Sequence, residues 1–323
     1  MSRKYKSPGT VCKSRIPEGG LCLAKAPDIG YGWSVAGYRL IQTDRELAGL
    51  LERLNRSDPD RVALDLESEH NLHRYGIHVS LIQLFDGESV ALIDALAVRE
   101  RPLLRRLLQD SPWIKVMFDA SSDLATARAA LELGIRPIFD LAVAARLLGK
   151  GGSLSKLVSP AGAYGKSRFQ KADWMRRPLP AEMLEYAAGD VLPLLDLADA
   201  LLAELLGAGK LFRFLALNAQ VQAKTGVRDP FQGYKRLPAY ARLPEERKRL
   251  LSALWQAREK YAQRHDLPPH NVAGHDLLAA AARTCSGGPR ELAEALVERR
   301  SGVRLDAEEL AALIREALRR GVQ

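Results

Sequence analysis

The chain has 323 residues, of which 47% are hydrophobic and 27% charged, and its formal net charge at pH 7 is +9. This composition is typical of a soluble globular protein with one large domain or two ordinary ones. The most apolar run, residues 191–206, is interrupted by Asp196, Asp199 and Glu204, which favours an amphipathic helix and excludes a membrane span. The basic N-terminal residues lack the apolar stretch of a signal peptide, so none is expected.

Cysteine usage indicates a reducing compartment. The chain has three cysteines, an odd number, and it contains no CxxC motif. We therefore expect no disulfides and no cysteine zinc site, and we expect a cytoplasmic location.

Positive charge gathers towards the two ends of the chain. Residues 1–37 carry six Lys and Arg against two acids, and residues 240–323 carry 15 against 12. Residues 207–236 contain Asp229 as their single acid and six basic residues: Lys210, Arg213, Lys224, Arg228, Lys235 and Arg236. This distribution favours a polyanionic partner such as nucleic acid, with solubility alone as the alternative.

In chain order, residues 1–37 have no apolar period and are predicted to be a basic, flexible tail. A short strand and a helix follow, with Thr43 or Asp44 as the N-cap of the helix. Strands are expected at 61–67, 78–87 and 88–95, where they form a meander. A helix at 101–109, a strand at 114–120, a helix at 123–134 and a further helix after Asp140 are expected to follow. Gly134 is the expected end of the helix at 123–134. This order indicates an α/β fold with a mixed sheet flanked by helices.

The second half of the chain is predicted to be mostly helical. The first domain is expected at 38–215, with Pro193 kinking a helix or starting a new one. Residues 216–238 hold several Gly and Pro and are predicted to connect two domains. Helical patterns over 239–323 predict a small all-α domain.

Two carboxylates stand two positions apart in the apolar strand pattern around residue 65. Side chains alternate along a strand, so Ala63, Asp65 and Glu67 share one face. The two carboxylates are then about 7 Å apart along the strand. Both carboxylates can then reach one hard divalent cation. The alternative for such a pair is an ordinary solvated strand end.

Three further residues have chemistry that fits the same site. Asp123 stands at the start of a predicted helix, where it could equally cap the helix. Tyr186 and Asp190 are four residues apart on one helical face and within contact range of each other. The alternatives are an amphipathic core tyrosine and an ion pair between Asp190 and a base such as Arg146.

In the order D-x-E, D and Y-x3-D, these residues resemble the DEDDy group of 3′→5′ exonucleases, and the ribonuclease D family most closely. The resemblance spans about 38–205 and implies an RNase H-like exonuclease fold. Its flanking matches are Tyr75, Leu81-Ile82-Gln83, Lys166, Gln170, Asp173-Trp174, Arg177-Pro178-Leu179 and Ala187-Ala188. The helical segment at 239–323 resembles the helicase-and-RNase-D C-terminal (HRDC) nucleic-acid-binding domain. Ser68, Phe118, Asp119 and Leu141 depart from the usual flanking residues and bear on affinity or substrate fit.

The resemblance implies two-metal hydrolysis of RNA phosphodiesters from the 3′ end, with nucleoside 5′-monophosphates as products. Its implied catalytic residues are Asp65, Glu67, Asp123, Tyr186 and Asp190, and the four acids would hold two Mg²⁺ or Mn²⁺ ions. The expected substrate is RNA, including tRNA precursors. DNA is not excluded, and the alternative of another class is a catalytically inactive nucleic-acid-binding adaptor.

Basic residues of the segment that precedes Tyr186 are candidate phosphate contacts: Lys166, Arg168, Lys171, Arg176 and Arg177. Arg177 and Trp174 have a role in packing as their alternative. His73 and His78 lack the spacing of a zinc site, so a zinc nuclease is not expected. No membrane partner is expected, and the oligomeric state stays open.

Overall fold

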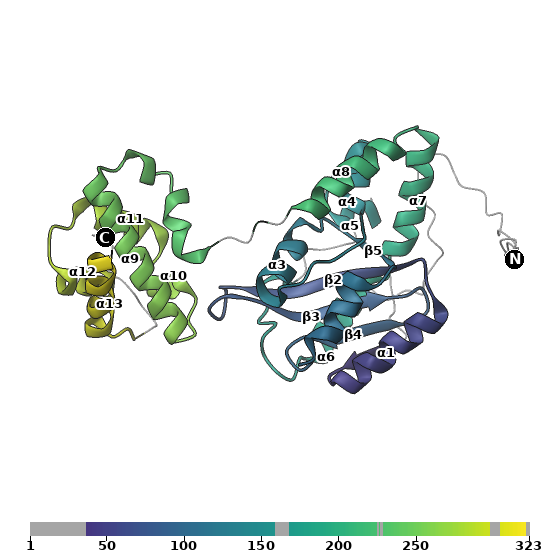
Figure 1. Ribbon diagram of the computed structural model, residues 1–323, viewed down its shortest axis with the longest axis horizontal. Helices are drawn as coiled ribbons and strands as arrows, with labels where there is room; N and C mark the ends of the chain where they lie inside the picture. The colour runs from purple at the N-terminus through teal and green to yellow at the C-terminus, as the bar shows by residue number, and fades with distance from the viewer. Residues whose placement is uncertain (1–36, 159–167, 225, 227–228, 298–303, 321–323) are drawn as a thin grey trace, which may run out of the picture. The chain divides into compact units, whose positions relative to one another are not determined.

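The computed structural model describes residues 37–158, 168–224, 226, 229–297 and 304–320 (Figure 1). Within these residues, two separate hydrophobic cores are found, one between Ile41 and Val221 and the other between Leu243 and Ile314. The predicted basic tail at 1–37 lies almost wholly outside the described residues. No described helix is both long and apolar enough to cross a membrane.

The first core is built around one mixed sheet of six strands. Along the sheet the strands follow the order β1-β4-β3-β2-β5-β6. Their bounds are β1 Tyr38–Ile41, β2 Arg61–His70, β3 Ile77–Phe85, β4 Val90–Asp94, β5 Ile114–Met117 and β6 Ile138–Asp140. β3 pairs antiparallel with β2 and β4, whereas β1–β4, β2–β5 and β5–β6 are parallel. The predicted mixed α/β fold is confirmed.

Helices cover this sheet and connect its strands (Figure 1). They are α1 Asp44–Ser57, α2 Arg101–Arg105 with the π turn η1 Arg106–Asp110, α3 Ser121–Leu131, α4 Leu141–Leu147, α5 Leu154–Val158, the 3₁₀ turn η2 Arg168–Lys171, α6 Ala181–Val191, α7 Leu194–Gly207 and α8 Leu211–Ala223. α6 packs against β2, β3 and β4, and α7 packs against β2 and β5. Pro193 is the N-cap of α7, so it starts a new helix as one of the two predicted outcomes.

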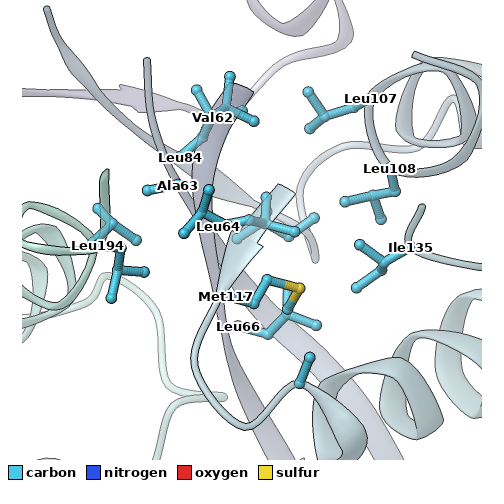
Figure 2. Packing of buried hydrophobic residues seen from close by; sticks show 14 of the residues in the cluster. Val62, Ala63, Leu64, Leu66, Leu84, Leu107, Leu108, Met117, Ile135 and Leu194 are labelled. Carbon is cyan, nitrogen blue, oxygen red and sulfur yellow. The ribbon is translucent and has the colours of Figure 1, made fainter. Parts of the chain in front are cut away.

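Both faces of β2 are packed at its start, where the consecutive residues Val62, Ala63 and Leu64 are all buried. Val62, Leu64 and Leu66 are buried on one face. Figure 2 shows Leu107 and Leu108 of η1 on one side of β2 and Leu194 of α7 on the other. The strand is therefore packed between two layers, and its other face carries Asp65 and Glu67.

The predicted N-cap of α1 is confirmed in detail. The Thr43 Oγ1 atom accepts a hydrogen bond from the Glu46 backbone N–H at 3.2 Å, and Glu46 Oε2 accepts from the Thr43 N–H at 3.1 Å. This reciprocal pair is a capping box. It fixes the start of α1, whose apolar face is buried in the core.

The structure differs from the sequence predictions in three places. α3 ends at Leu131 rather than at Gly134, because Glu132 takes the left-handed conformation (φ 57°) that ends the helix. The strand β6 was missed, since three residues are too short for a period. α8 continues to Ala223 and packs on the first core, so the boundary at 215 and the connector at 216–238 were wrong.

α8 continues past residue 215 because its side chains bind the edge strand β6. Asn218 Nδ2 donates to the Ile138 carbonyl at 2.7 Å, and Asn218 Oδ1 accepts from the Asp140 N–H at 2.9 Å. The Gln222 Oε1 atom accepts from the Ile138 N–H at 3.0 Å. The rings of Phe139 and Phe214 also pack at 4.6 Å. The backbone groups of this edge are thereby satisfied by side chains.

The second core is all helical, as predicted. Its elements are η3 Pro230–Arg236, η4 Tyr240–Arg242, α9 Glu245–Arg264, α10 Pro269–Val272, α11 His275–Thr284, α12 Pro289–Val297 and α13 Ala307–Arg320. Arg258 is 1% exposed, with its guanidinium 3.8 Å from the centre of the Trp255 ring and 2.5 Å from Glu259 Oε1. Arg258 is therefore a packing residue.

Gly233 of η3 lies directly against the Trp255 ring. A Cβ atom at residue 233 would stand 2.3 Å from Trp255 Cζ2, closer than any side chain tolerates. The Trp255 Nε1–H also donates to the Pro230 carbonyl at 2.8 Å, which holds the ring in place. This contact joins η3 to the helical core.

We expect Gly233→Ala to destabilise the C-terminal helical domain by about 1–3 kcal/mol, because the added methyl group overpacks the Trp255 contact. Urea unfolding followed by tryptophan fluorescence measures the change. Gly226→Ala is the matched control, since nothing lies within 4 Å of a Cβ atom at residue 226. Equal stability of the two variants would contradict the packing role of Gly233.

Candidate active site

β2 presents the first two predicted site residues on one face of the sheet. Asp65 pairs in register with Gln83 of β3, and Glu67 pairs with Leu81. The register shifts between Glu67 and Ser68, so the regular ladder is interrupted just after the second carboxylate. The predicted shared face of Asp65 and Glu67 is confirmed, and it is the face on which α6 packs.

The other predicted residues come from two helices. Asp123 lies in the first turn of α3, whose N-cap is Ala120 without a side-chain hydrogen bond. Tyr186 and Asp190 lie on α6, and the Tyr186 side chain hydrogen bonds to the Asp190 carboxylate. Arg146, the alternative ion-pair partner of Asp190, instead places its NH1 atom 3.8 Å from Asp119 Oδ1.

The four carboxylates lie close enough together to perturb one another. Burial raises the pKa of Glu67 well above its usual value, and the charges of Asp65, Asp190 and Asp123 raise it further. Burial also raises the pKa of Asp123, with Asp65 as the next cause. Three separate segments therefore converge at one place, as the sequence pattern predicts.

Burial is also the largest effect on the remaining two carboxylates. Burial raises the pKa of Asp65 to about 6. Burial and the Asp65 charge raise the pKa of Asp190 to about 7, against the opposing effect of the Tyr186 hydrogen bond. None of the described residues that shift these pKa values is a lysine or an arginine. Each of the four residues is half-buried.

Aromatic rings hold Tyr186 in place. Its ring packs 5.4 Å from that of Phe169 and 6.3 Å from that of Trp174. Trp174 is buried, and its Nε1–H donates to the Phe169 carbonyl at 3.1 Å. The phenol of Tyr186 is thus positioned by two neighbouring aromatic residues that are themselves linked.

Asp140 is a buried carboxylate that supports the site without facing it. It accepts hydrogen bonds from the backbone N–H groups of Asp119 at 3.0 Å and Ala120 at 3.1 Å, just before α3. It also accepts from the Ala142 N–H at 2.9 Å and so caps α4. Asp140 therefore fixes the turn that places Asp123. The sequence indicated only that a helix begins after this residue.

Arg177 is tied to the sheet and is unavailable to a phosphate. Its Nε and one terminal nitrogen each lie 2.7 Å from an oxygen of Asp94, which is 3% exposed. Further N–H groups donate to the carbonyls of Trp174 and Ser80. The prediction of a phosphate contact at Arg177 was wrong because a bidentate ion pair occupies the guanidinium.

The other predicted phosphate contacts have different outcomes. Lys166 and the side chain of Arg168 lie outside the described residues. Lys171 and Arg176 are exposed. Exposure leaves both available to a polyanion, so both stay predictions.

Gln83, the β3 residue paired with Asp65, has a buried amide group without hydrogen bonds to other described residues. Its side chain is fully buried, yet neither the amide nitrogen nor the amide oxygen has a hydrogen-bond partner among the described residues. Such a group costs folding free energy, and this cost is typical of functional sites. The family resemblance included Gln83, but its burial beside Asp65 could not be predicted from the sequence.

The described residues also contain a group of metal-ligand types that includes none of the four predicted acids. Glu69, His73 and Asp173 each place one ligand atom within 4.8 Å of the others. His73 thus has two acidic neighbours in space that its position in the sequence did not indicate, and the expectation against a zinc nuclease stays a prediction. Glu69 is nevertheless satisfied, because it accepts from the N–H groups of Leu72 and His73 and contacts His73 Nδ1 at 3.1 Å. These bonds explain the buried carboxylate as a support for the turn after β2.

We expect Asp190→Asn to stabilise the protein in the presence of a chelator, and to do so more at pH 8 than at pH 5. Native Asp190 has a pKa of about 7 against 3.8 for an unperturbed carboxyl, so wild-type stability falls as the pH rises between these values. The advantage of the variant should grow by at most about 1.4 kcal/mol per pH unit and level off above pH 7. Urea unfolding at pH 5, 6, 7 and 8 measures it.

At each pH, the free energy of unfolding of the variant is compared with that of wild type. Lys115 and His70 also have shifted pKa values, but they contribute equally to both proteins and cancel in the difference. Asp196→Asn, on the exposed surface of α7, is the matched control and should show no such pH dependence. A pH-independent advantage of Asp190→Asn would contradict the raised pKa.

We expect Arg177→Met to destabilise the fold by about 3 kcal/mol, because it leaves the buried Asp94 carboxylate without its partner. Arg176→Met changes the exposed neighbouring arginine and should alter stability by less than about 0.5 kcal/mol. Urea unfolding of the two variants tests this. Equal losses in both would show that the Asp94 pair is not the stabilising contact.

Comparison with known proteins agrees with this geometry. Residues 38–206 match the family described as 3′-5′ exonuclease, and residues 247–314 match the HRDC domain. Ribonuclease D of Xanthomonas oryzae pv. oryzae is 33% identical over 243 residues, which are 72% of this chain and 65% of that protein. Ribonuclease D of Escherichia coli is 30% identical over 284 residues, which are 87% of this chain and 75% of that protein.

The solved structures show the same relationship. The crystal structure of Escherichia coli RNase D, described as an exoribonuclease involved in structured RNA processing, matches with a TM-score of 0.70 at 28% identity, over 87% of this chain and 75% of that one. The chain thus spans between 65% and 75% of the length of these ribonucleases D. The sheet and the helical domain match a 3′-5′ exonuclease followed by an HRDC domain, and the chain belongs to the ribonuclease D family of 3′-5′ exonucleases.

Proposed function

We propose that the protein is a 3′→5′ exoribonuclease that hydrolyses RNA phosphodiester bonds from the 3′ end and releases nucleoside 5′-monophosphates. One observation carries this proposal. Asp65, Glu67, Asp123 and Asp190 gather from β2, α3 and α6 although their charges repel one another. Clustered carboxylates with raised pKa values and no basic neighbour among the described residues are suited to cationic cofactors.

The donor set fits two divalent cations. It consists of carboxylate oxygens alone, which favours Mg²⁺ or Mn²⁺ over softer metals. Asp65 would contact both ions, Glu67 and Asp190 would hold one of them, and Asp123 would help to hold the other. When bound, such a pair activates water and neutralises charge on the leaving oxygen of a phosphodiester.

Tyr186 would orient the attacking water. Its phenol already hydrogen bonds to Asp190, and the rings of Phe169 and Trp174 restrict its position. A phenol with its usual pKa near 10 is a poor base at pH 7, so its contribution is alignment by a hydrogen bond.

RNA is the proposed substrate, with tRNA precursors and other structured RNA 3′ ends as its physiological form. Support comes from the Escherichia coli relative, whose structure is described as that of an exoribonuclease involved in structured RNA processing. Lys171 and Arg176 are proposed to contact phosphates near the site. DNA is the alternative substrate, because discrimination depends on recognition of the 2′-OH group. A cytoplasmic location is proposed from cysteine usage, and Cys285 is a free thiol in the structure.

We expect Asp65→Asn and Asp190→Asn each to reduce hydrolysis by at least about 10³-fold, because the loss of one ligand removes several kcal/mol of transition-state stabilisation. Tyr186→Phe should reduce it by about 10²-fold. The assay follows 5′-labelled single-stranded RNA and the matching DNA in Mg²⁺, in Mn²⁺ and in a chelator. Products should shorten one nucleotide at a time, and the chelator should stop the reaction.

Asp196→Asn is the matched control and should keep wild-type turnover, since its carboxylate is exposed on α7. Turnover retained in Asp65→Asn or Asp190→Asn would remove the site assignment. Faster degradation of DNA than of RNA would make DNA the substrate in place of RNA. Binding of RNA without hydrolysis in either metal would favour the inactive adaptor.

A further inference from the structure

α4 and α8 lie side by side in the exonuclease domain (Figure 1). Their side chains line an open hollow of about 350 Å³. Its apolar surface comes from four aliphatic side chains: Val143, Leu147, Leu217 and Val221. Three basic residues, Arg146, Arg213 and Lys224, line it as well. No acid is among its lining residues.

The basic side chains of α8 are free because of how this helix is anchored. Phe214 and Asn218, four residues apart, face β6, where Asn218 hydrogen bonds to the edge strand. Arg213 and Lys224 are eleven residues apart, three turns of helix, and so lie on another common face. Both are exposed, and within the described part of the chain neither forms an ion pair. Both belong to the basic segment 207–236 that the sequence singled out.

This combination of surfaces selects a particular chemistry. Arginine and lysine around a hollow without acids favour a polyanion, and guanidinium groups also stack on flat aromatic rings. Aliphatic walls fit the face of a nucleobase, and the volume lies in the range of small-ligand sites. A bare phosphate ion would leave the aliphatic walls unused, whereas a nucleotide contacts both kinds of surface.

The dimensions favour a strand over a single nucleotide. Eleven residues of helix place Arg213 and Lys224 about 16 Å apart. A stacked strand advances about 3.4 Å per nucleotide, so this span covers several phosphates.

The hollow is also connected to the catalytic side of the domain. Arg146 NH1 lies 3.8 Å from the Asp119 carboxylate, and Asp119 follows β5 in the turn that leads to Asp123. The charge of Asp119 acts on Asp123 directly. One basic residue of the hollow is thus next to the segment that carries a predicted metal ligand.

We propose that the hollow between α4 and α8 binds nucleotides of the substrate RNA that lie upstream of the 3′ end. Arg213, Lys224 and Arg146 contact their phosphates, and the aliphatic walls receive a base. This inference rests on the proposed function, because it assigns a second contact to the same RNA substrate. It predicts that long RNA binds more tightly than RNA too short to reach from the site to the hollow.

The test compares the double variant Arg213→Gln/Lys224→Gln with the full-length wild-type protein. In a chelator, binding of a fluorescent 20-nucleotide single-stranded RNA is followed by anisotropy between 50 and 300 mM salt. We expect the variant to bind about 10-fold more weakly at low salt, and the slope of log K against log salt to fall by about 1.4, because each phosphate contact contributes about 0.7. In Mg²⁺, kcat/KM for a trinucleotide should stay within about two-fold of wild type.

The matched control is Arg45→Gln/Arg56→Gln, which removes two exposed arginines from α1 in the same domain. It should change binding of the long RNA by less than two-fold. A loss in the double variant no larger than in this control would overturn the proposal. So would an equal loss for the trinucleotide and the 20-nucleotide RNA, which would indicate damage to the site or the fold.

Two further outcomes separate the related hypotheses. If fluorescent 5′-AMP binds wild type but not the double variant while long-RNA binding is unchanged, the hollow is a site for free nucleotide and the proposal is wrong. If the protein hydrolyses no RNA but the double variant still loses binding of long RNA, the binding site stands and the exonuclease function falls. The chelated binding assay makes these two failures distinguishable.

Discussion

Repulsion among four partly buried carboxylates is the constraint on which the structure of the site depends. Asp65 and Glu67 cannot separate, because β2 is held between β3 and β5 in the middle of the sheet. Asp123 and Asp190 are brought to them by α3 and α6. The packing of the domain must therefore supply the free energy that keeps these carboxylates buried and close together. Burial is the largest cause of their raised pKa values, and repulsion adds to it for Glu67, Asp123 and Asp190.

Two buried polar connections support this arrangement from outside the site. Asp140 joins the turn before α3 to the start of α4 through three backbone N–H groups. Arg177 joins the segment before α6 to Asp94 at the end of β4. Both replace solvent contacts by several charge-assisted hydrogen bonds, so each fixes a backbone segment rather than a single side chain. The positions of Asp123 and Tyr186 follow from these connections.

The basic residues of the chain include two contrasting groups: those paired with a buried acid and those exposed without an ion pair among the described residues. Arg177 and Arg258 are engaged by Asp94 and Glu259, and their charges serve packing. Arg213 and Lys224 have no such partner within the described residues and face solvent beside an aliphatic surface. Only the second kind is available to a polyanion. A net charge of +9 therefore indicates a class of partner but does not locate its binding surface.

The sequence by itself determined the α/β and all-α halves, the shared face of Asp65 and Glu67, and the pairing of Tyr186 with Asp190, since each depends on the short periods of strands and helices. It also determined the identity of the family, because motif order survives without coordinates. Only the tertiary structure decided the extension of α8 along β6, the support from Asp140, the pairing of Arg177 with the buried Asp94, and the burial of Gln83. The extension of α8 and the pairing of Arg177 depend on contacts between residues more than 70 positions apart (Asp140 and Asn218, Arg177 and Asp94), and the support from Asp140 on contacts 20 and 21 positions apart. Local pattern carries no information about such pairs, because a strand edge or an acid acquires its partner only when the chain folds.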